Sequence, residues 1–319
     1  MKICVNFLVI LLIKHRIMRI VFMGTPDFAV ASLAALVNAG FEVAAVVTAA
    51  DKPAGRGQKL SESAVKKYAV AQGIPVLQPV KLKDPEFITA LKAINADLHV
   101  VVAFRMLPEI VFNMPPKGTI NLHGSLLPQY RGAAPINHAI INGEKESGVT
   151  TFFLKQEIDT GDVIASRKVS IADDDTAGDL HDRLMEVGAE LLVETVQTIA
   201  TGDYQEVPQD PAVEIKHAPK IFKDFCRIDW NQPVETVYNL VRGLSPYPTA
   251  FTSLNEKNLK VFKAEVEHKE PGIAAGGFLT DGKTYLKFAT KDGFLKLTDL
   301  QYEGKKRMTV EEFLRGIRL

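Results

Sequence analysis

The 319-residue sequence has few cysteines, no net charge and no apolar run long enough to span a bilayer. Cys4 and Cys226 are too few for a disulfide framework or a cysteine-rich zinc site, so a reducing compartment, the cytoplasm, is expected. Because 38 Lys and Arg balance 38 Asp and Glu, general electrostatic coating of nucleic acid is excluded, and any such contact must be local. The longest apolar run, residues 7–13, is too short to cross a membrane, so no membrane partner is predicted.

Several motifs of common enzyme classes are also missing. Residues 23–27, MGTPD, contain only Gly24 where a dinucleotide-binding turn has Gly-x-Gly-x-x-Gly, and no Gly-x-x-x-x-Gly-Lys-Ser/Thr loop occurs. Nicotinamide, flavin and phosphate-loop chemistry are therefore disfavoured, and Gly24 is interpreted as a tight turn between a strand and a helix. No Gly-x-Ser-x-Gly motif supplies a nucleophilic serine, and no His and Cys cluster has metal-ligand spacing. Neither a covalent nucleophile nor a metal site is predicted.

The first 17 residues are set apart from the fold. Lys2 precedes the apolar run and Lys14 to Arg16 follow it, which superficially resembles a signal peptide, but no small-residue cleavage site is present. Met18 then opens a new strand-like run. Residues 1–17 are therefore expected to be a non-native start or an extension, with a targeting or anchoring element as the alternative. A chain beginning at Met18 is expected to fold and to be active.

The rest of the chain divides by its texture. Strands are predicted at 19–23, 42–48, 98–103 and 118–123, and helices at 27–38, 63–72, 84–94 and 176–201. This alternation is typical of βαβ units, so 18–202 is predicted to be an α/β domain around a parallel sheet. Residues 203–221 contain three prolines and no periodicity, which indicates a linker. Short strands separated by Gly and Asp turns predict a small antiparallel β-barrel at 222–319.

Two segments contain residues suited to acyl transfer. On a strand, Asn121 and His123 share one face, and Gly124 ends the strand at the edge where open α/β sheets bind ligands. Asp159 lies in an Asp-Thr-Gly-Asp turn between two β runs, a sequence that on its own is commonly just a turn. An acid, an imidazole and a carboxamide without a nucleophile suit general acid-base catalysis and oxyanion stabilisation.

A third segment is a basic loop after the second strand. Lys52, Arg56 and Lys59 alternate there with glycine and proline in DKPAGRGQKL. Glycines let the backbone approach a phosphate chain and the three cations supply charge, so the loop is a candidate phosphate-binding segment. A solvated basic loop is the alternative.

Together these segments resemble a known family. MRIVFMGTPDFA, DKPAGRGQKL, INLHGSLLPQYRGAAP and IDTGD, in this order, closely resemble the bacterial type of methionyl-tRNA formyltransferase within the formyltransferase superfamily. The resemblance covers residues 18–319. It implies a Rossmann-like domain that binds 10-formyltetrahydrofolate and a C-terminal OB-like domain that helps to hold the initiator methionyl-tRNA.

The resemblance also implies roles for individual residues. Asn121, His123 and Asp159 would be catalytic, Ser125, Leu126, Leu127 and Pro128 would form the folate-pocket loop, and Arg56, flanked by Lys52 and Lys59, would contact the tRNA acceptor end. No metal is implied, and a monomer is expected. One departure concerns residues 102–108, VAFRMLP, where many members have VAYGLILP. The segment is one residue shorter, with Arg105 in place of a glycine, so the resemblance does not determine the geometry of the folate pocket here.

The expected reaction is transfer of a formyl group to the free amino group of methionyl-tRNA. His123 and Asn121 would donate hydrogen bonds to the tetrahedral oxyanion, and Asp159 would orient His123 and relay the amine proton. Two alternatives remain open. One is a formyltransferase acting on a nucleotide sugar or a purine precursor. The other is a non-catalytic RNA-binding protein on a degenerate Rossmann scaffold.

Overall fold

The structure is a computed structural model that describes residues 18–54 and 59–317. The predictions for residues 1–17 and for Arg56 lie outside the described residues. No helix in the described ranges is both long and apolar enough to cross a membrane.

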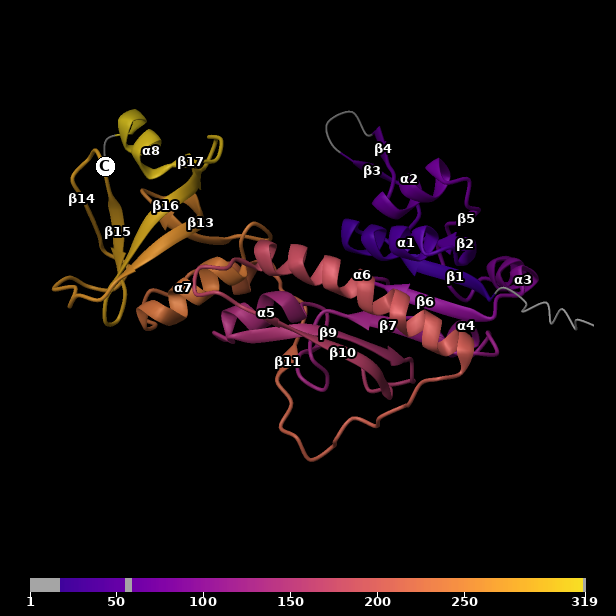
Figure 1. The fold of residues 1–319 in the computed structure, drawn as a ribbon. Coiled ribbons are helices and arrows are strands. Elements are labelled where there is room, and N and C mark those ends of the chain that lie inside the picture. Colours follow the sequence, from indigo (N-terminus) through magenta and orange to yellow (C-terminus); the bar gives the residue numbers. More distant parts are fainter. Residues whose placement is uncertain (1–17, 55–58, 318–319) are drawn as a thin grey trace, which may run out of the picture.

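A mixed sheet forms the centre of the N-terminal domain, with the strand order β10-β9-β7-β6-β1-β2-β5 (Figure 1). Its strands are β1 Arg19–Gly24, β2 Glu42–Val47, β5 Val76–Leu77, β6 Leu98–Val102, β7 Thr119–His123, β9 Glu146–Phe153 and β10 Val163–Ser170. The five neighbouring strands β7, β6, β1, β2 and β5 pair in parallel, whereas β9 pairs antiparallel with both β7 and β10. The predicted α/β class and its parallel core are confirmed. The antiparallel direction of β9 and β10 was not predicted, because periodicity does not give strand direction.

Helices cover both faces of this sheet. They are α1 Asp27–Asn38, α2 Ala64–Ala71, α3 Pro85–Ile94, α4 Glu109–Phe112, α5 Pro135–Ile141 and α6 Ala177–Thr201. Along β1, Ile20 and Phe22 pack in the cluster that includes α1, α2 and α6, while Val21 and Met23 face α3 and α4. This alternation follows from the strand period of two residues. The long helix α6, predicted at 176–201, begins directly after its N-cap Thr176 and lies along the sheet (Figure 1).

Two short strand pairs lie outside the main sheet. β3 Lys52–Ala54 pairs antiparallel with β4 Lys59–Ser61 in a hairpin that carries the basic loop. β8 Arg131–Gly132 pairs in parallel with β11 His217–Ala218. The second pair joins the segment after β7 to the end of the interdomain connection.

The connection 203–221 returns across the N-terminal domain instead of leaving it directly (Figure 1). Val207 and Val163 exchange two backbone hydrogen bonds of 2.8 and 2.9 Å. Ala218 accepts hydrogen bonds from the backbone N–H groups of Ala133 and Ala134. Side-chain periodicity carries no sign of these contacts, because most of them are made by the backbone.

An antiparallel sheet forms the centre of the C-terminal domain, with the strand order β12-β13-β16-β15-β14 and β17 beside β16. Its elements are the 3₁₀ helix η1 Lys223–Cys226, α7 Val234–Gly243, β12 Ala250–Leu254, β13 Lys257–Glu267, β14 Phe278–Thr280, β15 Leu286–Ala289, β16 Phe294–Tyr302, β17 Met308–Thr309 and α8 Val310–Gly316. The Trp230 ring stacks on Phe288 in its core, with centroids 4.7 Å apart. The predicted antiparallel architecture is confirmed. The sequence analysis did not predict helix α7.

The two domains meet through α5 and α7. The Asn137 amide donates a hydrogen bond of 2.8 Å to the carbonyl oxygen of Gly243. The buried Arg242 guanidinium donates to the carbonyl oxygen of Asp175 over 3.1 Å. Asn137 also lines the cavity described below, so this contact lies next to that site.

Candidate functional site

A cavity of about 630 Å³ lies at the carboxyl ends of β1, β6 and β7. After β1, the next strands β2 and β5 lie on one side of β1. The strands that follow in the chain, β6 and β7, lie on its other side, so the strand order reverses between β1 and β6. Open α/β sheets bind ligands at such a switch point. The volume lies within the range of roughly 300–1,000 Å³ that is typical of small-molecule sites.

The cavity walls are mostly apolar. They come from Pro26 and Phe28 after β1, residues 103–107 after β6, residues 132–137 at the start of α5 and residues 154–159 after β9. Asn121, His123 and Asp159 also line this cavity. The structure therefore brings together the three residues predicted to be catalytic. An apolar enclosure with a few polar groups is suited to hold and orient an organic ligand.

Asn121 and His123 project from β7 into the cavity, while the intervening Leu122 packs in the core. The His123 side chain is buried, and Asn121 is half-buried. Among the described residues, no side chain or backbone group makes a hydrogen bond with the Asn121 carboxamide. Its donor and acceptor groups are therefore available to a ligand.

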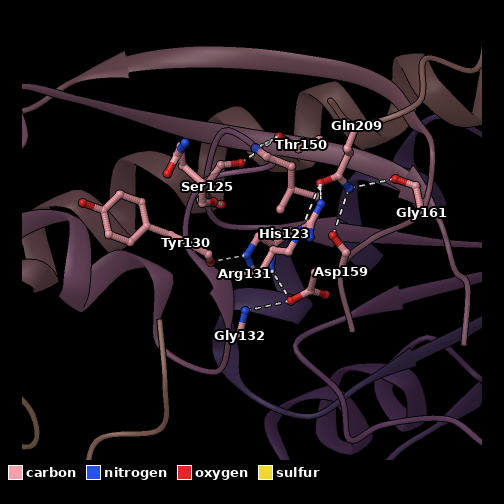
Figure 2. A network of polar contacts seen from close by, with 11 residues as sticks. His123, Ser125, Tyr130, Arg131, Gly132, Thr150, Asp159, Gly161 and Gln209 are labelled. Atoms are coloured by element: carbon pink, nitrogen blue, oxygen red, sulfur yellow. Dashed lines mark hydrogen bonds and ion pairs between the residues drawn. The ribbon is translucent and has the colours of Figure 1, made fainter. Parts of the chain in front are cut away.

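One backbone carbonyl and one carboxylate face the two nitrogens of the His123 ring (Figure 2). Nε2 lies 2.9 Å from the carbonyl oxygen of Tyr130, and because a carbonyl only accepts, Nε2–H is the donor. The second ring nitrogen, Nδ1, lies 3.8 Å from Oδ2 of Asp159. Nδ1 is thus the nitrogen that can exchange a proton or donate to a ligand.

A polar network holds Tyr130, which has a positive φ of 60°. Its hydroxyl donates to Glu144 over 2.5 Å and accepts from Asn142 over 3.1 Å, while Lys216 contacts Glu144 over 2.6 Å. Burial and the neighbouring carboxylate raise the pKa of Tyr130. Burial alone would raise the pKa of Glu144, but hydrogen bonds from Lys216 and Tyr130 lower it overall. The carbonyl that orients His123 is therefore firmly placed.

Asp159 occupies a tight turn, and its carboxylate faces Nδ1 of His123, whereas the Tyr130 carbonyl contacts Nε2. Its backbone has a positive φ of 55°, and its Oδ2 accepts a hydrogen bond of 2.9 Å from the N–H of Gly132. The side chain of Gln209 donates to the carbonyl oxygens of Asp159 and Gly161 over 2.9 and 2.8 Å (Figure 2). Neither Gln209 nor Tyr130 was predicted to belong to the site. No local sequence signal could have found Gln209, because its partners lie 48 and 50 residues away.

The four residues predicted to form the folate-pocket loop lie beside the cavity lining instead of in it. Ser125 is fully buried, and its hydroxyl donates to the carbonyl oxygen of Gln129 over 2.6 Å. The Thr150 hydroxyl donates to the carbonyl oxygen of Ser125 and accepts from the N–H of Leu127. Leu126 packs close to Gly148 on β9. The role of Ser125, Leu126, Leu127 and Pro128 in folate binding stays a prediction.

The shortened segment after β6 forms one wall of the cavity. Ala103 has a positive φ of 47°, and Phe104, Arg105, Met106 and Leu107 line the cavity. The Arg105 guanidinium donates to the carbonyl oxygens of Pro79 and Val80, the second over 2.8 Å. In this chain, an arginine thus ties the segment to the loop before α3.

The basic residues of the β3–β4 hairpin are only partly described. Lys52 is exposed, whereas Arg56 lies outside the described residues, and for Lys59 only the backbone is described. Their role in tRNA binding stays a prediction. Within residues 18–54 and 59–317, no group of three or more His, Cys, Asp or Glu side chains has the geometry of a metal site.

Comparisons with known proteins agree on one family. Residues 18–196 match the family model described as "Formyl transferase", and residues 220–318 match "Formyl transferase, C-terminal domain". The chain is 55% identical over 315 residues to the methionyl-tRNA formyltransferase of Parabacteroides distasonis, covering 96% of this chain and 97% of the relative.

Solved structures share the fold at lower identity. One is WlaRD, a sugar 3N-formyl transferase, with a TM-score of 0.65, 22% identity and coverage of 91% of this chain and 100% of that chain. Another is HypX from Aquifex aeolicus in complex with tetrahydrofolic acid, with a TM-score of 0.64, 21% identity and coverage of 95% and 48%. The family models and the closely similar relative together establish that the chain belongs to the methionyl-tRNA formyltransferase family.

Proposed function

We propose that the chain transfers a formyl group from 10-formyltetrahydrofolate to the amino group of initiator methionyl-tRNA, for translation initiation. The observation that carries the proposal is the cavity in which Asn121, His123 and Asp159 meet, in a chain of this family. No nucleophilic side chain is needed, because an amine can attack a formyl carbon directly.

We propose that the donor occupies the cavity described above. Apolar residues, among them Phe104, Leu107 and Ile136, line the space, and it has the size of a small-molecule site. These walls suit the ring system of a folate, and the polar groups of Asn121 and His123 lie where a reactive formyl group can meet them. The folate supplies the formyl group on its N10 nitrogen.

The three polar residues then divide the chemistry between them. As the amine nitrogen bonds to the formyl carbon, the formyl oxygen gains negative charge, and the Asn121 amide donates a hydrogen bond to it. His123 adds a second donor through Nδ1–H when that nitrogen is protonated, since Nε2–H is committed to Tyr130. Each such donor typically stabilises the transition state by about 2.7–4 kcal/mol.

Asp159 completes the proton transfers in the proposed mechanism. Its carboxylate lies 3.8 Å from His123 Nδ1, so it stabilises the protonated imidazole and accepts the proton that the attacking amine loses, directly or through a water. When the carbon–N10 bond breaks, N10 takes up a proton and tetrahydrofolate leaves. The products are formylmethionyl-tRNA and tetrahydrofolate.

We propose that the tRNA contacts the chain outside the cavity. The β3–β4 hairpin, with Lys52, Arg56 and Lys59, is assigned to the acceptor end, and the C-terminal domain helps to hold the tRNA. The proposed division is 18–202 for catalysis, 203–221 for the connection and 222–319 for tRNA binding. We further propose a cytoplasmic monomer.

The test is a formylation assay with purified protein and 10-formyltetrahydrofolate. Methionyl-tRNA, an amino-sugar nucleotide and a purine-precursor amine are supplied separately as acceptors. We expect rapid formylation of methionyl-tRNA and none of the other two. Transfer to the sugar or the purine precursor instead would favour the small-substrate alternative, and tRNA binding without any formyl transfer would favour a non-catalytic RNA-binding protein.

A further inference from the structure

Gln209 lies in the connection between the domains, between the residues that match the two family models. The residues before and after it, Pro208 and Asp210, are exposed, whereas Gln209 is half-buried against the turn that carries Asp159. We propose that Gln209 is a positioning residue that holds the Asp159 carboxylate in its reactive place. The proposal rests on the function assigned above to Asp159.

The nitrogen of the Gln209 carboxamide is fully used by that turn. It donates to the carbonyl oxygen of Asp159 over 2.9 Å and to that of Gly161 over 2.8 Å. The two acceptors lie on either side of Thr160, so one amide group closes the turn from outside. An NH₂ group has two donors, and both find a partner here.

The oxygen of the same carboxamide fixes which way the group points. It accepts from Nε and from a terminal nitrogen of Arg131, over 3.1 and 2.5 Å. Arg131 precedes Gly132, whose N–H donates to the Asp159 carboxylate. Gln209 thus links both segments that determine where the carboxylate lies (Figure 2).

Asp159 needs this support because its backbone is strained. A positive φ of 55° is uncommon for a residue other than glycine, and such conformations persist where the surroundings over-determine them. Gln209 itself is held on both sides, by the Val163 and Val207 backbone pair and by the β8 and β11 pair. The connection is therefore a structural part of the catalytic site as well as a tether between domains.

Three variants test whether the hydrogen bonds of the Gln209 carboxamide position Asp159. Gln209→Ala removes all four hydrogen bonds. Gln209→Glu keeps an acceptor for Arg131 but replaces the donor nitrogen with an oxygen that faces two carbonyl groups. Asp210→Ala is the matched control, because Asp210 is the next residue of the same connection, is exposed, and has a carboxylate that accepts from the N–H of Ala212 and not from a residue of the site.

We expect Gln209→Ala and Gln209→Glu each to lower kcat for formyl transfer by about ten- to a hundredfold, the usual scale for misplacing a reacting group by about 1 Å. The KM values for both substrates should change little, and Asp210→Ala should keep the wild-type kcat. Thermal unfolding of all variants serves to exclude loss of fold. A Gln209→Glu protein with wild-type kcat, or an Asp210→Ala protein as impaired as Gln209→Ala, would overturn the proposal.

A double-mutant cycle with Asp159→Asn distinguishes this proposal from the catalytic assignment on which it rests. If Gln209 acts through Asp159, Gln209→Ala should lower kcat in the wild-type background and leave it unchanged in the Asp159→Asn background. Equal losses in both backgrounds would show that Gln209 acts elsewhere. A near-wild-type kcat of Asp159→Asn alone would instead remove Asp159 from the mechanism.

Discussion

Gly161 has no room for a side chain, so Gly161→Ala tests the catalytic role proposed for the turn that carries Asp159. A Cβ added at Gly161 would lie 1.6 Å from the carbonyl oxygen of Phe153 on β9. Real Cβ atoms essentially never come closer than 3.0 Å to such an atom, so the turn must move away from β9 by about 1.4 Å. The backbone oxygen of Gly161 would then lose its place against the Gln209 amide.

The expected loss follows from the size of that movement. Asp159 lies two residues before Gly161 and 3.8 Å from Nδ1 of His123, so a shift of this size changes the proton-transfer distance by a large fraction. A misplacement of about 1 Å can cost about a hundredfold in rate. We expect Gly161→Ala to lower kcat by about a hundredfold and to destabilise the fold by about 1–3 kcal/mol, the usual cost of overpacking.

The assay is steady-state formyl transfer to methionyl-tRNA, with urea unfolding of the same preparations. Gly316→Ala is the control, because its added Cβ meets none of the described atoms within 4 Å. That variant should keep the wild-type kcat. If Gly161→Ala were folded and as active as wild type, the geometry of the Asp159 turn would not matter for catalysis.

Three further predictions concern other parts of the molecule. Arg56→Ala should weaken the use of methionyl-tRNA far more than the use of 10-formyltetrahydrofolate. It should also reduce the slope of log K for tRNA binding against log salt concentration by about one unit. If the tRNA saturation parameters and the slope equal those of wild type, Arg56 is not part of the site. Arg105→Ala should raise the KM for 10-formyltetrahydrofolate about five- to tenfold by releasing a cavity wall, and an unchanged KM would contradict this role. Burial lowers the pKa of His99 from 6.5 to about 4, so the unfolded chain binds the proton first as the pH falls. Urea unfolding should therefore show that the free energy of unfolding falls by about 2 kcal/mol between pH 7 and pH 5. His99→Gln should largely remove this decrease, and an equal pH dependence of stability in both proteins would contradict the role of His99.

Local patterns predicted much of the N-terminal domain. The helix expected at 27–38 matches α1, and the helix expected at 176–201 matches α6, which runs between its caps Thr176 and Gly202. These signals are local, because caps and apolar periodicity act within a few residues.

The meeting of Asn121, His123 and Asp159 could be predicted only in part. The strand period places Asn121 and His123 on one face, which the cavity lining confirms. Nothing local shows that the Asp159 turn lies against them, and the family resemblance supplied that expectation. The position of Gln209 and the role of the Tyr130 carbonyl depend on backbone acceptors, which every residue carries and no sequence pattern marks.

The proton-transfer role proposed for Asp159 is tested by a single-turnover measurement of formyl transfer with both substrates bound. Wild type and Asp159→Asn are mixed with saturating methionyl-tRNA and 10-formyltetrahydrofolate, and formylmethionyl-tRNA is followed over time. We expect a rate at least about a hundredfold lower for Asp159→Asn, with unchanged binding of both substrates, because the carboxylate acts on the proton and not on affinity. A single-turnover rate close to that of wild type would show that the Asp159 carboxylate takes no part in the reaction.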